Sequence, residues 1–197
     1  MSVNNYPGGE IPSPAGQANK VLTTNGSSVL WGAGSGMTLL GSVNASGSFV
    51  SISNIDQSYR DLRIVGVNLR VASSDVIQVR VNNVTGSSYY SVTYLGTVSS
   101  TSVTNTTGIN GAPFAQIFTN GANGLVLDII NYSDTALNAK PWRSVSGNSN
   151  SASQFTGFGV FNSSANTQYG GIGNITSVGF YSNNNFNAGT FYLYGVK

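Results

Sequence analysis

The chain has 197 residues, of which 40% are hydrophobic and 11% aromatic, while only 7% carry charge, against about 25% in an average soluble domain. Eight basic and six acidic residues give a formal net charge of +2, and the arginines are scattered, which argues against nucleic-acid binding. The absence of His and Cys excludes Ser-His and Cys-His catalysis, thiolate and imidazole metal sites, and disulfides.

Residues 1–36 differ from the rest of the chain, because they hold three of its five prolines. Within them, Asn25-Gly26 lies between two short apolar or β-branched runs, which predicts a β-hairpin. A two-residue turn there would place Leu22 opposite Val29. The glycine-rich run 32–36 predicts a flexible joint. We see neither a secretory signal nor an apolar run long enough to span a membrane.

From residue 37 to residue 197 the sequence predicts short strands separated by Gly, Asn and Ser. Residues 75–82 alternate apolar and polar side chains, which indicates a half-buried strand. The segment 62–71 changes parity, which a bulge near Gly66 or a strand covered on both faces would explain. The run 124–132 is typical of a central strand, in which Asp128 needs a partner. Tyr90, Val92 and Tyr94 repeat the alternation, and further strands are expected at 37–43, 48–53, 113–119, 153–162, 174–182 and 189–196.

These segments show no helical periodicity, and we expect at most a short helical turn. About ten short strands at intervals of roughly 10–15 residues are typical of an all-β antiparallel β-sandwich or jelly roll. The sequence therefore predicts an N-terminal hairpin-containing arm, 1–36, and a β-sandwich knob, 37–197.

The residues offer little catalytic chemistry. Six carboxylates could include a glycosidase pair or hold calcium, but Asp56 and Asp75 are typical of turns, Asp61 precedes a strand, and Asp128 and Asp134 bracket a strand end. We expect no catalytic residue, no metal and no cofactor.

Exposed aromatic residues and amides could bind a glycan or a protein. Lys140-Pro141-Trp142-Arg143 stands out, because a proline inside a strand-like segment indicates an edge or a loop, where a Trp between two cations would form a contact patch. Tyr169 and Tyr181 are further aromatic candidates for stacking on sugar. The surface contacts that we expect are Tyr89, Tyr94, Lys140, Trp142 and Arg143, although core packing is the commoner role of such aromatic residues.

The order of segments resembles a family. Residues 58–64 lead into 75–82, and the chain closes on 174–180 and 189–197. This order is similar to that of small virion proteins of tailed bacteriophages, including cyanophages, which are minor tail, fibre or capsid-decoration proteins. The element 16–32 is similar to a short segment of phage fibre and head-fibre proteins.

The resemblance implies a trimeric, non-enzymatic virion protein on the capsid surface, assembled in the host cytoplasm. We expect a decoration or cement protein that binds the major capsid protein, or another virion protein, through its N-terminal arm. The alternative is a tail-tip or short tail fibre protein that recognises host surface glycans. A small glycan-active enzyme is disfavoured by the absence of His. The residues expected to contact symmetry mates or the capsid are Val21, Leu22, Val29, Leu30 and Trp31.

Overall fold

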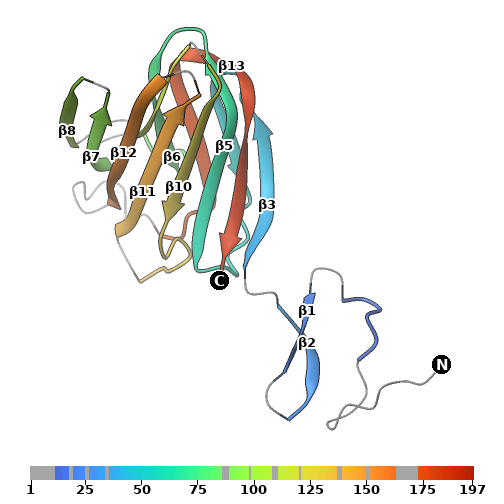
Figure 1. The fold of residues 1–197 in the computed structure, drawn as a ribbon. Coiled ribbons are helices and arrows are strands. Elements are labelled where there is room, and N and C mark those ends of the chain that lie inside the picture. The colour runs from blue at the N-terminus through green and yellow to red at the C-terminus, as the bar shows by residue number, and fades with distance from the viewer. Residues whose placement is uncertain are drawn as a thin grey trace. The chain divides into compact units, whose positions relative to one another are not determined.

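The chain divides into two compact units, Met1–Gly36 and Met37–Lys197. Figure 1 shows the strands of both units in the computed structural model. No helix occurs among the described residues, which are 12–17, 20–24, 27–33, 36–85, 89–97, 99–107, 111–119, 121–136, 139–149, 151–162 and 173–197.

The described residues form thirteen strands. The first unit contains β1 (Lys20–Thr24) and β2 (Val29–Ala33). The second unit contains β3 (Met37–Asn44), β4 (Gly47–Ser53), β5 (Asp61–Val71), β6 (Asp75–Val81), β7 (Tyr89–Gly96), β8 (Thr101–Thr107), β9 (Ala112–Ile117), β10 (Asn123–Ile129), β11 (Ala139–Asn148), β12 (Ser151–Asn162) and β13 (Ser177–Val196).

The strands of the second unit form one curled antiparallel sheet (Figure 1). Its large part has the order β8-β7-β12-β11-β10-β5, followed by residues 186–196 of β13 and then β3. Its small part consists of β4, residues 177–181 of β13, β6 and β9. The predicted all-β antiparallel fold of the sandwich type is confirmed, and the two C-terminal strands expected from the sequence are one continuous strand that serves both parts.

Aromatic rings from both halves of β13 fill the space between the two parts of the sheet. Phe180 and Phe191 stack with their ring centroids 4.0 Å apart, and Phe186 meets Phe191 edge to face. Phe114 of β9 lies beside Phe180, with 6.0 Å between centroids. All four rings are buried. Since each such pair adds roughly 0.5–1.5 kcal/mol beyond its buried area, this cluster is the centre of the core.

The parity change in β5 is a β-bulge at the predicted place. The pairing of β5 with β10 shifts register between Leu69 and Gly66, and Asn68 adopts a φ of 54°. A side chain at Gly66 would place its Cβ 2.6 Å from Leu69 Cδ1 and 2.8 Å from Leu125 Cγ. Glycine is therefore required where the bulge returns the buried side chains to the core.

Two polar side chains fix the corners at which the chain passes between the two parts. Asp75 accepts hydrogen bonds through Oδ2 from Ser182 Oγ (2.7 Å), Asn183 N (2.6 Å) and Asn184 N (3.2 Å). This carboxylate holds the bend in β13. Asn123, at the start of β10, hydrogen-bonds both the N–H and the carbonyl of Phe118 and so holds the β9–β10 corner. Its side chain is buried, since the residue is 1% exposed.

Two serines on the core-facing side of β11 contact the backbone of β9. Ser144 Oγ donates to Phe114 O (2.5 Å), and Ser146 Oγ donates to Gln116 O (3.3 Å) while accepting from Gln116 N (3.2 Å). Among the described strands β9 pairs only with β6, so these serines satisfy backbone groups on its other edge. Val145, which alternates with these two serines, faces outward and is 41% exposed.

Pro141 lies inside the sheet, so the expected edge or loop at this residue was wrong. β11 pairs with β10 on one side and β12 on the other. Pro141 O accepts from Ile130 N, just beyond Ile129–Trp142, the last pair of the β10–β11 ladder. The nitrogen and the carbonyl of a strand residue point to the same side, so the nitrogen of Pro141 faces β10. Because the β10–β11 pairing ends at Ile129–Trp142, no ladder hydrogen bond needs the N–H that proline lacks.

Candidate functional site

The first unit presents a two-stranded ribbon with apolar residues on both faces. Leu22 pairs with Trp31, and Thr24 with Val29, so the expected pairing of Leu22 with Val29 was wrong. The connection spans four residues, 25–28, rather than two, which shifts every pair by two positions and leaves the faces unchanged. Asn25-Gly26 itself lies outside the described residues.

One face of this ribbon carries Leu22, Val29 and Trp31, and the other carries Val21 and Leu30, as the register requires. Val21, Leu22 and Leu30 are 48%, 42% and 38% exposed. Trp31 is partly buried, and its Nε1 donates to Pro12 O (3.0 Å). A lone two-stranded hairpin is marginally stable in water. Apolar residues on both of its faces make this ribbon a candidate contact surface.

Three of the five residues expected to form a surface contact patch are buried, so that patch does not exist as predicted. Tyr89 is fully buried; its hydroxyl accepts from Val81 N and donates to Val84 O. Burial raises the pKa of Tyr89 to about 12. These contacts give Tyr89 a structural role in the core.

Lys140 and Trp142 face the core from β11. Lys140 Nζ donates to Asp134 O, and burial lowers the pKa of this lysine. Trp142 is 2% exposed and stacks on Phe161 with centroids 5.9 Å apart. Gly157 makes room for the indole, because a Cβ there would lie 3.2 Å from Trp142 Cζ3.

Tyr94 and Arg143, the other two expected contacts, do lie on the surface. Tyr94 is 39% exposed, and the Arg143 side chain is 71% exposed. Of the further aromatic candidates, Tyr181 lies under Arg80, with 4.5 Å from the guanidinium carbon to the ring centroid. Tyr169 lies outside the described residues.

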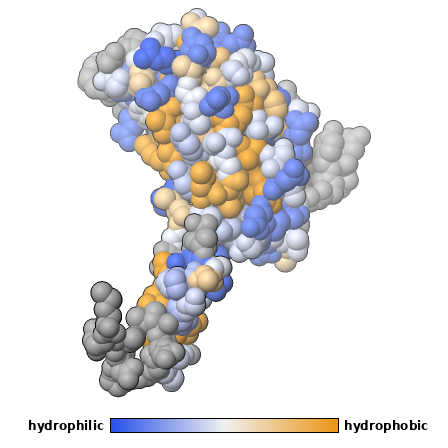
Figure 2. Space-filling model, turned by 90° about the vertical axis from the view of Figure 1, so that its right-hand side faces the viewer, coloured by the Kyte–Doolittle hydropathy of each residue, from blue (hydrophilic) through white to orange (hydrophobic). Residues whose placement is uncertain are grey.

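On the outer face of the large part of the sheet, apolar residues of neighbouring strands lie opposite one another. Val126 is paired with Val145 on one side and Val65 on the other. Val145 is 41% exposed, although valine is usually buried. The β3 side of this unit, which Figure 2 shows, also has hydrophobic residues gathered in its middle. Phe158 of β12 and Tyr94 of β7 stack on the same outer face with centroids 5.9 Å apart.

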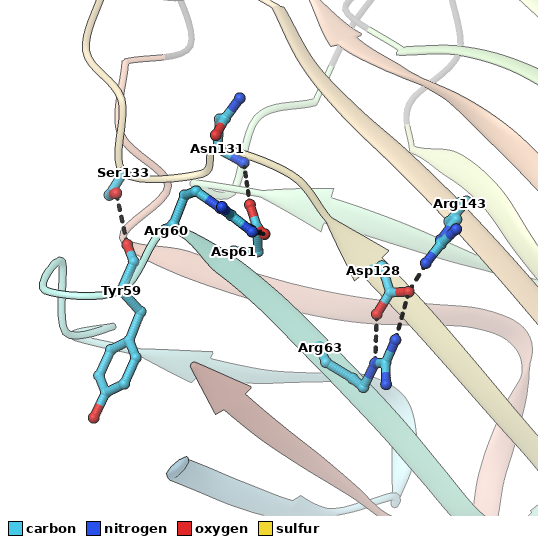
Figure 3. A network of polar contacts seen from close by, with 8 residues as sticks. All are labelled: Tyr59, Arg60, Asp61, Arg63, Asp128, Asn131, Ser133 and Arg143. Atoms are coloured by element: carbon cyan, nitrogen blue, oxygen red, sulfur yellow. Dashed lines mark hydrogen bonds and ion pairs between the residues drawn. The ribbon is translucent and has the colours of Figure 1, made fainter. Parts of the chain in front are cut away.

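Beside this apolar surface lies a charged cluster centred on Asp128 (Figure 3). Its Oδ1 accepts from Arg63 Nε (2.6 Å), while its Oδ2 accepts from Arg63 Nη2 (2.9 Å) and Arg143 Nε (3.1 Å). Partial burial by itself raises the pKa of the Asp128 carboxyl, but the hydrogen bonds from Arg63 and Arg143 outweigh burial, and the net pKa is lowered. The sequence signal was the lone acid in the apolar run 124–132.

A second ion pair, Arg60–Asp61, lies beside this cluster. Arg60 Nη2 lies 2.8 Å from Asp61 Oδ2, and Asp61 Oδ1 accepts from Asn131 N (2.9 Å). Ser133 Oγ donates to Tyr59 O (2.7 Å), which ties the β10–β11 connection to the start of β5 (Figure 3). Arg63, Arg143 and the Arg60–Asp61 pair line a depression of about 360 Å³.

The other described aspartates serve turns rather than a shared acid–base site. Asp56 Oδ1 accepts from Ser58 N (2.9 Å), and Asp134 Oδ1 accepts from Ala136 N (2.7 Å). Both are Asx-type turn bonds, in which a side chain accepts from an amide two residues ahead. These two carboxylates, like that of Asp75, therefore have local structural partners.

Within the described part of the chain, no group of three or more His, Cys, Asp or Glu residues could hold a metal ion. The same residues include no helix with the length and apolar character needed to cross a membrane. The chain matches no family model, no curated protein and no solved structure.

Proposed function

We propose that this chain is a structural bacteriophage protein, a homotrimeric decoration or cement protein. In this proposal residues 1–36 attach it to the major capsid protein or another virion protein, and the sandwich faces outward. The resemblance of the segment order to small virion proteins supports the proposal. The single observation that carries it is the β1–β2 ribbon, whose two faces both present apolar side chains.

A ribbon with two apolar faces needs two contacts to bury them. Leu22, Val29 and Trp31 lie on one face, and Val21 and Leu30 on the other. Symmetry mates can cover one face while the shell covers the second. Each fully buried Val or Leu side chain contributes roughly 1.5–3 kcal/mol, so three copies of such a ribbon supply enough free energy for a stable attachment.

The second candidate is a tail-tip or short tail fibre protein that holds host surface glycans. The observation that favours it is the exposed aromatic pair Tyr94–Phe158 on the outer face of the sandwich. The number of copies in purified particles separates the two candidates. Hundreds of copies indicate a decorated capsid, and a few to some tens indicate a tail.

Two single substitutions test the ribbon, one for each face. We expect one of Leu22→Asp and Leu30→Asp to dissociate the trimer in light scattering. We expect the other to leave the trimer intact and abolish attachment to isolated particles. Removal of residues 1–36 should abolish attachment while leaving a folded, soluble sandwich.

Val103→Asp is the matched control, because Val103 on β8 is an apolar residue that is even more exposed, at 56%. It should change neither the mass of the assembly nor attachment. If both ribbon variants remain trimeric and bind particles like the parent protein, the ribbon is not the contact surface and the proposal fails.

A further inference from the structure

Arg143 presents an unused hydrogen-bonding edge at the surface. Its Nε donates to Asp128 Oδ2 (3.1 Å), which fixes the plane of the guanidinium. Neither of its Nη groups has a hydrogen-bond partner within the described residues. The side chain is 71% exposed. A guanidinium held in this way offers parallel N–H donors that match the two oxygens of a carboxylate.

The charge of Asp128 does not cancel that of Arg143. Arg63 already binds both oxygens of Asp128, through Nε and Nη2, and the side chain of Asp128 is only 15% exposed. Asp61 is paired in turn with Arg60. One positive charge therefore remains in excess, and it lies on the outermost of the three arginines.

Two aromatic side chains lie on the same outer face as Arg143, on the side of β11 away from Asp128. Phe158 is the cross-strand partner of Arg143 on β12, which places their Cβ atoms about 5 Å apart on the same face. Phe158 is 45% exposed and stacks with Tyr94. The faces of aromatic rings are negative, and so they attract the polarised C–H groups on one side of a sugar ring.

Beyond Phe158 the outer face continues as an apolar depression of about 700 Å³ over β7, β12 and β11. Val92, Pro141 and Val160 contribute its apolar lining, and Asn105 and Thr106 add neutral polar groups at the β8 side. Neutral amides and hydroxyls can hydrogen-bond sugar hydroxyls without ionic competition. From Phe158 on β12 the depression therefore extends across the strands to β7 and β8 on one side and to Pro141 of β11 on the other.

From these features we propose that the outer face of β7, β12 and β11 binds an acidic saccharide of the uronate class. Arg143 holds the carboxylate, and the Phe158–Tyr94 pair stacks on a ring of the sugar chain. A single guanidinium with free Nη groups, on the same face as two aromatic rings, fits one carboxylate on a sugar better than the closely spaced phosphates of a nucleic acid, which need clustered cations. This inference concerns the sandwich surface alone and does not rest on a virion role.

The test is calorimetric titration of the full chain with an oligogalacturonate and with the same oligosaccharide as its methyl ester. The ester keeps the ring and the hydroxyls but has no charge. We expect binding of the acid, binding at least about tenfold weaker for the ester, and weakening with salt. Arg143→Gln should weaken acid binding by at least about tenfold, since a charge-assisted contact is lost.

Phe158→Ala separates stacking from charge, and it should weaken both the acid and the ester. Arg70→Gln is the matched control, because Arg70 is exposed on β5 seven residues beyond Arg63, and this variant should bind like the parent chain. Unchanged thermal unfolding of the variants shows that the fold is intact. The proposal is overturned if the acid does not bind, if Arg143→Gln binds it normally, or if Arg70→Gln loses as much affinity.

Discussion

Replacing Asn123 by Asp tests whether the β9–β10 corner is held by a side chain that must donate. Asn123 Nδ2 donates to Leu69 O (2.9 Å), Phe118 O (2.7 Å) and Gly121 O (3.2 Å). Its Oδ1 accepts from Phe118 N and Asn148 Nδ2, both at 2.9 Å. Asp has the same shape, but a carboxylate would direct a negative oxygen at three carbonyl oxygens in a site that is 1% exposed.

The expected cost depends on pH, and its sign follows from the pKa of the new carboxyl. Burial and the facing carbonyls raise that pKa in the folded state, whereas the unfolded value is about 3.9. Below about pH 3.9 the carboxyl is protonated in both the folded and the unfolded state. The variant then loses only some of the hydrogen bonds that Asn123 Nδ2 donates, which costs roughly 1–3 kcal/mol. As pH rises the unfolded state ionises first, so stability falls by about 1.36 kcal/mol per unit until the folded pKa is reached.

An upward shift of about 3 units, at the low end for buried carboxyls, predicts a further loss of about 3 kcal/mol between pH 4 and pH 7. The assay is urea unfolding of parent and Asn123→Asp at both pH values, followed by fluorescence of the buried Trp142. Asn105→Asp, at an exposed position of β8, is the control and should change stability by less than about 0.5 kcal/mol. A difference between parent and Asn123→Asp that is the same at both pH values would refute the reasoning.

Two further predictions concern backbone strain and acid stability. Gly189→Ala should cost at least about 3 kcal/mol, because φ is +105° and the new Cβ would lie 2.7 Å from Leu69 Cα. Gly47→Ala, at φ +67° with open space around it, should cost about 1 kcal/mol, and equal losses in urea unfolding would contradict the clash. The parent chain should lose stability as pH falls below about 4, since the pKa of Asp128 is lowered in the folded state. Asp128→Asn should lose less stability than the parent chain over this acid range in urea unfolding. An equal acid loss in both proteins would contradict this role of Asp128.

Local patterns predicted those parts of the fold in which one side of a strand is clearly more apolar. In β6 the alternating pattern predicted the buried residues Ile77, Val79 and Val81. The change of parity in 62–71 predicted the bulge near Gly66, and the lone acid in 124–132 predicted a paired Asp128. Each of these is a contrast between neighbouring residues, which the period of two in a strand makes readable.

The same reasoning failed on β7 and β11, where the alternation shows which residues share a face but not which face is buried. Tyr90, Val92 and Tyr94 lie on the outer face of β7, while Tyr89 and the small residues Ser91 and Thr93 face inward. For β11 the reason lies far away in the sequence. The backbone of β9 lies against Ser144 and Ser146 and is hydrogen-bonded by their hydroxyls, so small hydroxyl residues face inward there.

The choice of which face of β11 is buried also produces the surface proposed to bind the saccharide. Inward hydrogen bonds from Lys140 to Asp134 O and from Ser144 to Phe114 O fix the register of β11. Arg143 lies between Trp142 and Ser144, and therefore must point outward, beside Phe158. A one-residue slip would exchange the two faces, placing the guanidinium in the core and the indole in water. The inward-facing serines of β11 and the outward-facing Arg143 and Phe158 are therefore two consequences of one register.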